Sequence, residues 1–153
     1  MPLYYFDTSG LVKRYVAEIG TAWVTGIAAP AAGNLLYVAR LTGVEVVSAI
    51  ARRARSGSLS AAHAAAALVR FHADFKSRFH ITGITVALVK QAMRLAEAHL
   101  LRGYDAVQLA AALQVHKRCR IVGQSLTLVS ADADLNAAAV AEGLMVEDPN
   151  THP

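Results

Sequence analysis

The sequence predicts one α/β domain in which a mainly parallel β-sheet is flanked by helices. Three observations support this fold class. Patterns typical of strands and of helices alternate along the chain without a repeat, a linker or a shift in composition. The chain has 153 residues, 55% of them hydrophobic, which is enough for one domain with a real core and argues against disorder. The run Leu3–Phe6 is apolar on both faces, as is typical of an interior parallel strand.

The first third of the chain contains two strand patterns, each followed by a helical one. After the strand Leu3–Phe6, two hydroxyl residues can cap a helix over Gly10–Val16. A short helix is expected over Thr21–Ala29, because a proline follows it. Asn34–Ala39 is the second strand, and it leads directly into a helix over Arg40–Arg55 that ends at a Ser-Gly pair.

Two long helices are expected in succession in the middle of the chain. The first, Arg40–Arg55, has one apolar stripe formed by Leu41, Val44, Val47 or Ser48, and Ala51. The second, Ala61–Lys76, is rich in alanine. Its apolar positions recur every three or four residues, at Ala64, Leu68, Phe71 and Phe75.

The rest of the chain contains three more strand patterns with helical patterns between them. The strands are expected at His80–Ile84, Leu126–Ser130 and Leu144–Glu147. The helices are expected at Val86–Leu101, Tyr104–His116 and Asp132–Glu142. A threonine caps the first of these helices, and glycines precede the second and follow the third. The domain is therefore expected to span residues 1–148, with 149–153 as a polar C-terminal tail.

Composition narrows the classes of function. The net charge of +4 is a mild excess that suits an anionic partner such as nucleic acid. The single cysteine, Cys119, excludes an internal disulfide and a multi-cysteine zinc site, and we expect it to be a small buried residue. Because there is no long uncharged apolar run and no amino-terminal signal, we expect a cytoplasmic protein without a membrane segment. The absence of a Gly-Lys-Ser/Thr phosphate loop argues against nucleoside triphosphate hydrolysis.

Four acidic residues lie where a predicted element changes direction: Asp7, Glu45, Asp105 and Asp132. Because strand ends and helix starts share one edge of a parallel sheet, these carboxylates are expected to gather in one crevice. Two carboxylates 4 Å apart repel by about 4 kcal/mol at an effective dielectric near 20, so the cluster needs protons or cations. Oxygen-only ligands favour Mg²⁺ or Mn²⁺. The alternative is that each acid separately caps a helix or complements its dipole, and spacing alone leaves both interpretations open.

Four short motifs resemble those of a known family. They are Phe6–Ser9, Leu41–Glu45, Tyr104–Ala112 and Val129–Leu135. Their order and spacing are similar to the four motifs of PIN domains across nearly the whole chain, from Leu3 to Val146. The likeness is strongest to the VapC-like toxin ribonucleases of bacterial toxin–antitoxin pairs. The resemblance implies a three-layer α/β/α PIN-like domain with a mainly parallel central sheet.

The resemblance also implies a function: an endoribonuclease that cleaves RNA with one or two Mg²⁺ or Mn²⁺ ions. The implied catalytic residues and metal ligands are Asp7, Glu45, Asp105 and Asp132. The hydroxyl groups that would orient metal-bound water are those of Thr8, Ser9 and Ser130. The implied partners are a small antitoxin protein and a second copy of the chain. A housekeeping RNA-processing nuclease and a non-catalytic RNA- or protein-binding module on the same fold remain alternatives.

Several other residues are weaker candidates. The side chains of Lys13, Arg14 and Arg40 could bind RNA phosphates. Tyr15, Tyr37 and Tyr104 could stack on bases, although tyrosines at helical spacing usually pack in cores. The four histidines in predicted helices share no ligand spacing, so we expect them at the surface or partly buried. Asp134 lies two residues after Asp132, about 200° around a helix, and should point away from the site.

Overall fold

The computed structural model describes residues 1–153, and its central layer is a five-stranded sheet. The strands are β1 (Leu3–Phe6), β2 (Leu35–Ala39), β3 (His80–Thr82), β4 (Leu126–Val129) and β5 (Met145–Glu147). They are all parallel, in the order β3-β2-β1-β4-β5. The predicted mainly parallel sheet is therefore confirmed, with β1 at its centre.

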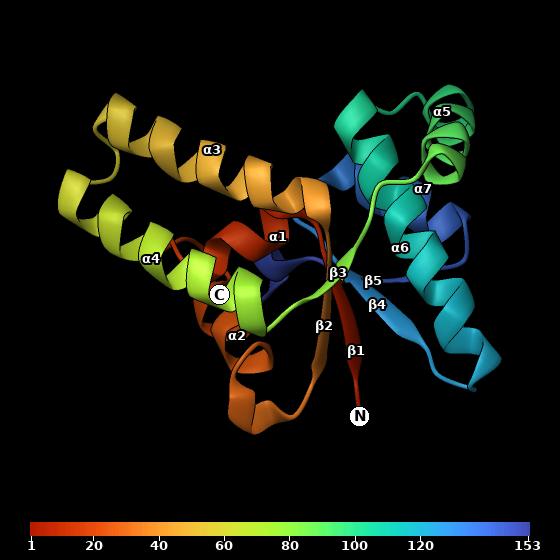
Figure 1. Ribbon diagram of the computed structural model, residues 1–153, viewed down its shortest axis with the longest axis horizontal. Helices are drawn as coiled ribbons and strands as arrows, with labels where there is room; N and C mark the ends of the chain where they lie inside the picture. Colours follow the sequence, from red (N-terminus) through yellow and green to blue (C-terminus); the bar gives the residue numbers. More distant parts are fainter.

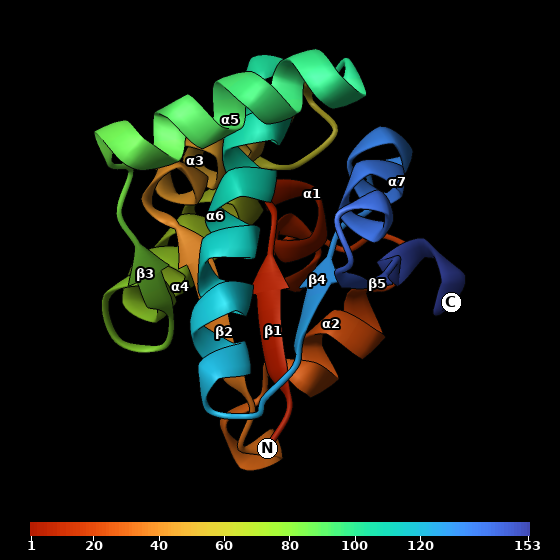
Figure 2. The same ribbon diagram turned by 90° about the vertical axis from the view of Figure 1, so that its right-hand side faces the viewer.

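Helices cover both faces of this sheet. One face carries α1 (Thr8–Leu11), α2 (Thr21–Ile27), α3 (Arg40–Ser56) and α4 (Ala61–Ser77). The other carries α5 (Val86–His99), α6 (Gly103–Ile121) and α7 (Ala133–Ala141). Figure 1 looks along the sheet with the two helical layers on either side, and Figure 2 shows α6 running alongside β1. The three-layer α/β/α architecture is confirmed. None of the helices combines the length and the apolar character needed to cross a membrane.

Two hydrophobic cores, one on each side of the sheet, stabilise the fold. Side chains alternate along β1, so Leu3 and Tyr5 pack toward α5, α6 and α7, and Phe6 packs toward the opposite layer. Within α6 the alanines from Ala110 to Ala112 are fully buried. Small side chains allow this helix to lie close to the sheet on one side and to α5 on the other. Cys119 is buried near the end of the same helix, as expected.

The apolar stripe predicted for α3 was wrong. Thr42, Val46 and Ile50 are the buried positions of this helix, whereas Val44 is 69% exposed. The helix carries apolar residues on more than one face, so hydropathy favoured a neighbouring stripe and passed over Thr42, Val46 and Ile50. Thr42 can be buried because its hydroxyl accepts a hydrogen bond from a buried side chain of α6.

The first helix and α6 differ most from their predicted bounds. The first helix is a single α-turn that begins at Thr8, followed by a 3-10 turn over Val12–Arg14, in place of one helix over Gly10–Val16. Helix α6 extends to Ile121, beyond the expected end at His116, because Val115 and Cys119 continue its buried face.

The segment that we expected to be a polar tail folds against α2. It forms a 3-10 turn over Pro149–Thr151, and the His152 ring stacks on the ring of Trp23 with the ring centres 4.2 Å apart. Gly20 lies under this turn with φ +87°, and an added Cβ would lie 2.3 Å from the carbonyl oxygen of Pro149. Both the backbone angle and the close approach therefore require glycine at this position.

Candidate active site

Asp7 is the first residue after β1, at the centre of the carboxyl edge of the sheet. Its backbone N–H still donates to the Val129 carbonyl (3.2 Å), so the pairing of β1 with β4 continues to this residue. Its carboxylate accepts a hydrogen bond from the Gly10 backbone N–H at 3.0 Å and caps α1. A side chain at position 10 would place its Cβ 2.5 Å from the Val129 carbonyl oxygen. Glycine therefore allows α1 to turn tightly over the end of β4.

Two serine hydroxyls connect the ends of β1 and β4. The Ser9 hydroxyl donates to the Asp7 carboxylate at 2.8 Å and accepts the Ala131 backbone N–H at 2.9 Å. The Ser130 hydroxyl lies 3.4 Å from the Ser9 hydroxyl and accepts the Asp132 backbone N–H at 3.1 Å. These contacts fix the backbone positions of the first and last of the four acids.

Glu45 reaches the same edge from the second turn of α3. Its Oε1 accepts hydrogen bonds from the Thr8 hydroxyl (2.9 Å) and from the Gln108 amide (2.8 Å). Gln108 is 2% exposed; its amide also donates to the Thr42 hydroxyl (3.0 Å), and its carbonyl oxygen accepts from the Tyr5 hydroxyl (2.8 Å). One glutamine therefore joins β1, α3 and α6 beneath Glu45.

Sequence reasoning missed Gln108. The available signal was its spacing, because residues three apart on a helix share a face and Gln108 lies three residues after Asp105. A polar residue in an otherwise apolar helical run, one turn from a candidate acid, indicates a residue that positions the site.

Replacing Gln108 with leucine should destabilise the fold. The change leaves the buried hydroxyls of Tyr5 and Thr42 without a partner, at a cost of roughly 1–3 kcal/mol for each unsatisfied group. Urea denaturation should show a reduced free energy of unfolding. The same change at the exposed Gln124 is the control and should be nearly neutral. Equal stability of the two variants would show that the buried network contributes nothing.

Asp105 and Asp132 share one cation, the Arg102 side chain. The guanidinium Nε donates to Asp105 (3.1 Å) and Nη2 donates to Asp132 (3.0 Å). The arginine side chain is 81% exposed, whereas those of the two acids are 18% and 21% exposed. Exposed ion pairs of this kind contribute little to stability, because solvent screens them. The sequence analysis did not single out Arg102. Its positive charge lies between two carboxylates, and breaking these exposed ion pairs should destabilise the fold little.

Burial and mutual repulsion disfavour ionisation of the acids. The pKa of Asp7 is raised to about 7, chiefly because the carboxyl is buried and additionally because the charge of Asp105 lies nearby. Hydrogen bonds from Gly10 and Ser9 oppose this shift. The pKa of Asp105 is also raised, first by burial and then by the charge of Asp132, while Arg102 opposes the shift. The protein therefore brings these acids close enough to interact. A bound cation would relieve both the repulsion between the carboxylates and the cost of burying their charge.

The fit of the site to a divalent metal rests on its chemistry. Asp7, Glu45, Asp105 and Asp132 supply only carboxylate oxygens, the donors that Mg²⁺ and Mn²⁺ prefer. In this conformation no group of three or more His, Cys, Asp or Glu side chains is arranged to hold a metal ion. The chemical type of the ligands thus fits a hard cation, but their present positions do not. To bind a metal ion, the four side chains would have to move closer together.

Asp132 and Asp134 differ in their surroundings. Asp132 caps α7 by accepting the Leu135 backbone N–H (2.9 Å), and its other oxygen faces Arg102. Asp134 is exposed and lies in a shallow pocket with His99 and Leu100 at the end of α5. The structure thus brings Asp132, but not Asp134, into contact with the side chain that also binds Asp105.

The predicted RNA-binding residues separate into two groups. Lys13 is buried, and its ammonium group contacts Glu18 (3.2 Å) and Asn150 (2.9 Å). Arg14 pairs with Asp74 at 2.9 Å. These internal partners argue against phosphate contacts by either residue. Arg40 is exposed at the end of β2 and has no ion pair, so it remains available to an anionic ligand.

Sheet order, helical layers and the position of the acids define the class of protein as a PIN-like α/β domain. Two curated ribonucleases of Mycobacterium tuberculosis are each 37% identical to it over 115 residues, which is 75% of this chain and 78% of the relative. They are Ribonuclease VapC45 of strain CDC 1551 / Oshkosh and Ribonuclease VapC49 of strain ATCC 25618 / H37Rv. The chain belongs to the VapC ribonuclease family. No protein-family model matches it.

Solved structures with the same fold cover almost all of the chain. PAE2754 from Pyrobaculum aerophilum superposes with a TM-score of 0.67 at 22% identity, covering 98% of this chain and 91% of that one. VapBC2 from Rickettsia felis, bound to a DNA fragment from their promoter, gives 0.61 at 14% identity, with 95% and 98% covered. FitAcB from Neisseria gonorrhoeae gives 0.60 at 16% identity, with 95% and 97% covered. At these identities the likeness shows the fold.

Proposed function

We propose that this chain is a divalent-metal-dependent endoribonuclease and the toxin of a toxin–antitoxin pair. The observation that carries the proposal is the convergence of Asp7, Glu45, Asp105 and Asp132 at one sheet edge in a member of the VapC ribonuclease family. Four separate helix caps would not explain this arrangement. Only Asp7 and Asp132 cap helices, whereas Glu45 is held by side chains and Asp105 shares an arginine with Asp132.

The four acids would together hold Mg²⁺ or Mn²⁺. Such an ion, when bound, lowers the pKa of a water molecule and stabilises negative charge on a phosphate. Ser9 keeps the Asp7 carboxylate in place, and Thr8 with Gln108 does the same for Glu45. Arg102 must release at least one acid, and its freed guanidinium is then available to an RNA phosphate.

The experiment that tests the proposed activity is RNA cleavage with controlled metal. A structured RNA incubated with the purified chain should be cut in Mg²⁺ or Mn²⁺, remain intact in EDTA, and be cut again when the metal is restored. The reason is that four carboxylates cannot all ionise around a phosphate without a cation. The Asp7→Asn protein, prepared in parallel, detects contaminating ribonuclease. Full cleavage in EDTA would contradict the mechanism.

A small antitoxin and a second copy of the chain are the proposed partners. In support, the chain belongs to a family of VapC ribonucleases, and α5 with the start of α6 exposes Val89, Met93 and Tyr104 around an apolar groove of about 440 Å³. Exposed apolar patches of this kind mark interfaces. Light scattering of the purified chain should therefore give the mass of a dimer.

Expression of the wild-type chain alone should arrest growth of its host. Co-expression of the adjacent reading frame should restore growth, and the Asp7→Asn chain should never arrest it. Normal growth with full in vitro cleavage would favour the alternative, an RNA-processing nuclease of the same fold.

A further inference from the structure

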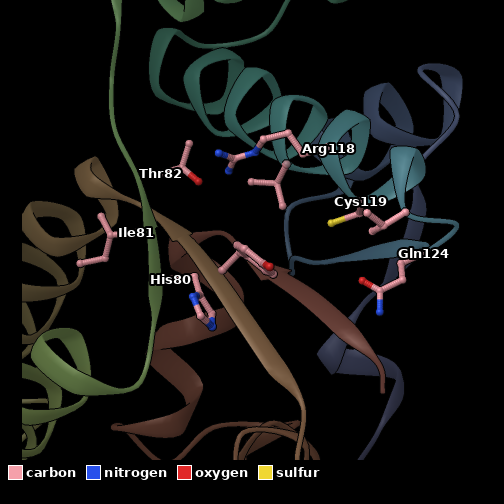
Figure 3. A pocket seen from close by; sticks show the side chains of 9 residues that line it. His80, Ile81, Thr82, Arg118, Cys119 and Gln124 are labelled. Carbon is pink, nitrogen blue, oxygen red and sulfur yellow. The ribbon is translucent and has the colours of Figure 1, made fainter.

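We propose that a pocket between β3 and the C-terminal half of α6 binds a phosphate-bearing nucleotide unit. The pocket has a volume of about 400 Å³, within the range of small-molecule sites. None of the four acids lines it, so it is separate from the candidate active site. Figure 3 shows His80, Ile81 and Thr82 on one side of the pocket, and Arg118, Cys119 and Gln124 on the other.

The pocket exists because β3 lies at the edge of the sheet and no helix covers it on this face. Helix α6 packs against β2 and β4, and α5 packs against α6. The face of β3 on this side is therefore left open beside the last turns of α6. In Figure 2 the β3 strand stands to one side of α6.

The polar groups of the lining are suited to an anion. No carboxylate lines the pocket, and Arg118 is exposed without an ion pair. Thr82 is 5% exposed, and its hydroxyl oxygen is buried without any hydrogen-bond partner. A buried hydroxyl of this kind needs a partner from outside the protein. The Thr82 hydroxyl and the free Arg118 guanidinium lie in the same pocket, and both can donate hydrogen bonds to phosphate oxygens.

The remaining lining suits a base. The rings of Tyr37 and His80 are 5.0 Å apart with an angle of 31° between their planes, and Val115 adds apolar surface. Aromatic faces stack on nucleic acid bases of any sequence. Charge, an unpaired hydroxyl and stacking surface together define the ligand class as a nucleotide with at least one phosphate.

This nucleotide has two possible sources, an RNA strand or a free nucleotide. In the register of β2 with β3, Thr82 lies opposite Ala39, and the exposed Arg40 follows directly. Along α6, Asp105 and Arg118 are separated by about 20 Å at 1.5 Å per residue. A single strand held at the acids would pass Arg40 and reach the pocket a few nucleotides away. This path rests on the proposed endoribonuclease function, whereas nucleotide binding in the pocket does not.

The first arm of the test measures RNA binding without cleavage. The Asp7→Asn chain is titrated in EDTA against a labelled single-stranded RNA, by fluorescence anisotropy, at several salt concentrations. The Arg118→Gln change should weaken binding at least about fivefold and reduce the salt slope by about one phosphate contact. Arg120→Gln is the matched control, since Arg120 is exposed on the same helix but does not line the pocket. Its affinity should stay within twofold.

The second arm uses 5′-AMP and the wild-type chain. NMR titration should shift the backbone amides of Ile81, Thr82 and Gln124, and Thr82→Val, which removes only the hydroxyl, should weaken this binding. Responses in both arms support an RNA subsite, and a response to 5′-AMP alone supports a free nucleotide. Unchanged RNA binding by Arg118→Gln together with no shift by 5′-AMP would overturn the proposal. If both binding experiments respond as expected but the wild-type chain shows no metal-dependent cleavage, the endoribonuclease function would be overturned instead.

Discussion

Replacing Asp7 with asparagine should reduce RNA cleavage at least about 100-fold, because groups that merely orient a metal ligand are worth 10- to 100-fold. Asparagine keeps the shape of the side chain and can still accept the Gly10 N–H as a helix cap. The loss is therefore one of chemistry and not of folding. Cleavage rates at saturating Mg²⁺, with circular dichroism to confirm the fold, measure the effect.

The same substitution should stabilise the metal-free chain at high pH. The pKa of Asp7 is raised from 3.8 to about 7 by burial, so between these values the folded state binds more protons than the unfolded state. The free energy of unfolding of the wild type therefore falls as the pH rises from about 4 to about 7, a loss that Asp7→Asn does not share.

The melting temperature in EDTA gives the readout. The advantage of Asp7→Asn over the wild type should be small at pH 5 and largest at pH 8. Asp134→Asn removes an equal charge at an exposed position and serves as the control. A lower melting temperature of Asp7→Asn at pH 8 would mean that the ionised carboxylate stabilises the metal-free fold, against the expected cost of its burial.

Serine at position 132 should lower cleavage by a similar factor, while serine at position 134 should leave it unchanged. The Asp132 carboxylate has two roles, since one oxygen caps α7 through Leu135 and the other faces Arg102 beside Asp105. Serine retains the first role, because it caps helices as well as aspartate does, and it loses the second. Melting temperatures of the two variants should therefore match while their cleavage rates differ.

Cleavage assays on Asp132→Ser and Asp134→Ser, run side by side at saturating Mg²⁺, decide between these two acids. A greater loss from the change at position 134 would show that the wrong acid has been assigned. An equal and small loss would show that neither the Asp132 nor the Asp134 carboxylate binds the metal.

Local sequence patterns were sufficient to predict the fold class and the edge at which the acids lie. A run apolar on both faces identified β1 as interior, and acids placed just after strands or just inside helices were expected at one edge because parallel strands end together. These signals are short-range. They depend only on neighbours along the chain and on the alternation of strands and helices.

Contacts between distant side chains could not be predicted in the same way. Lys13 is read from the sequence as a surface base, yet its partner Asn150 comes from the other end of the chain. Gln108 acts through Tyr5, Thr42 and Glu45, which belong to two other elements. The burial of Thr42 on α3 was missed for the same reason, since this polar residue is buried where Gln108 can donate a hydrogen bond to it.

The position of β1 between β2 and β4 also determines when, during synthesis, the carboxyl edge of the sheet with its four acids can assemble. Leu3 pairs with Leu35 on one side and with Leu126 on the other, so the central strand waits for the last fifth of the chain. Contacts so distant in sequence form slowly, and a ribosome adds only about 5–20 residues per second. A nascent chain that ends before β4 already contains three of the four acids, but it lacks Asp132 and the strand end that Ser9 binds. Incomplete translation products therefore carry three of the four proposed metal ligands without the assembled edge of the sheet.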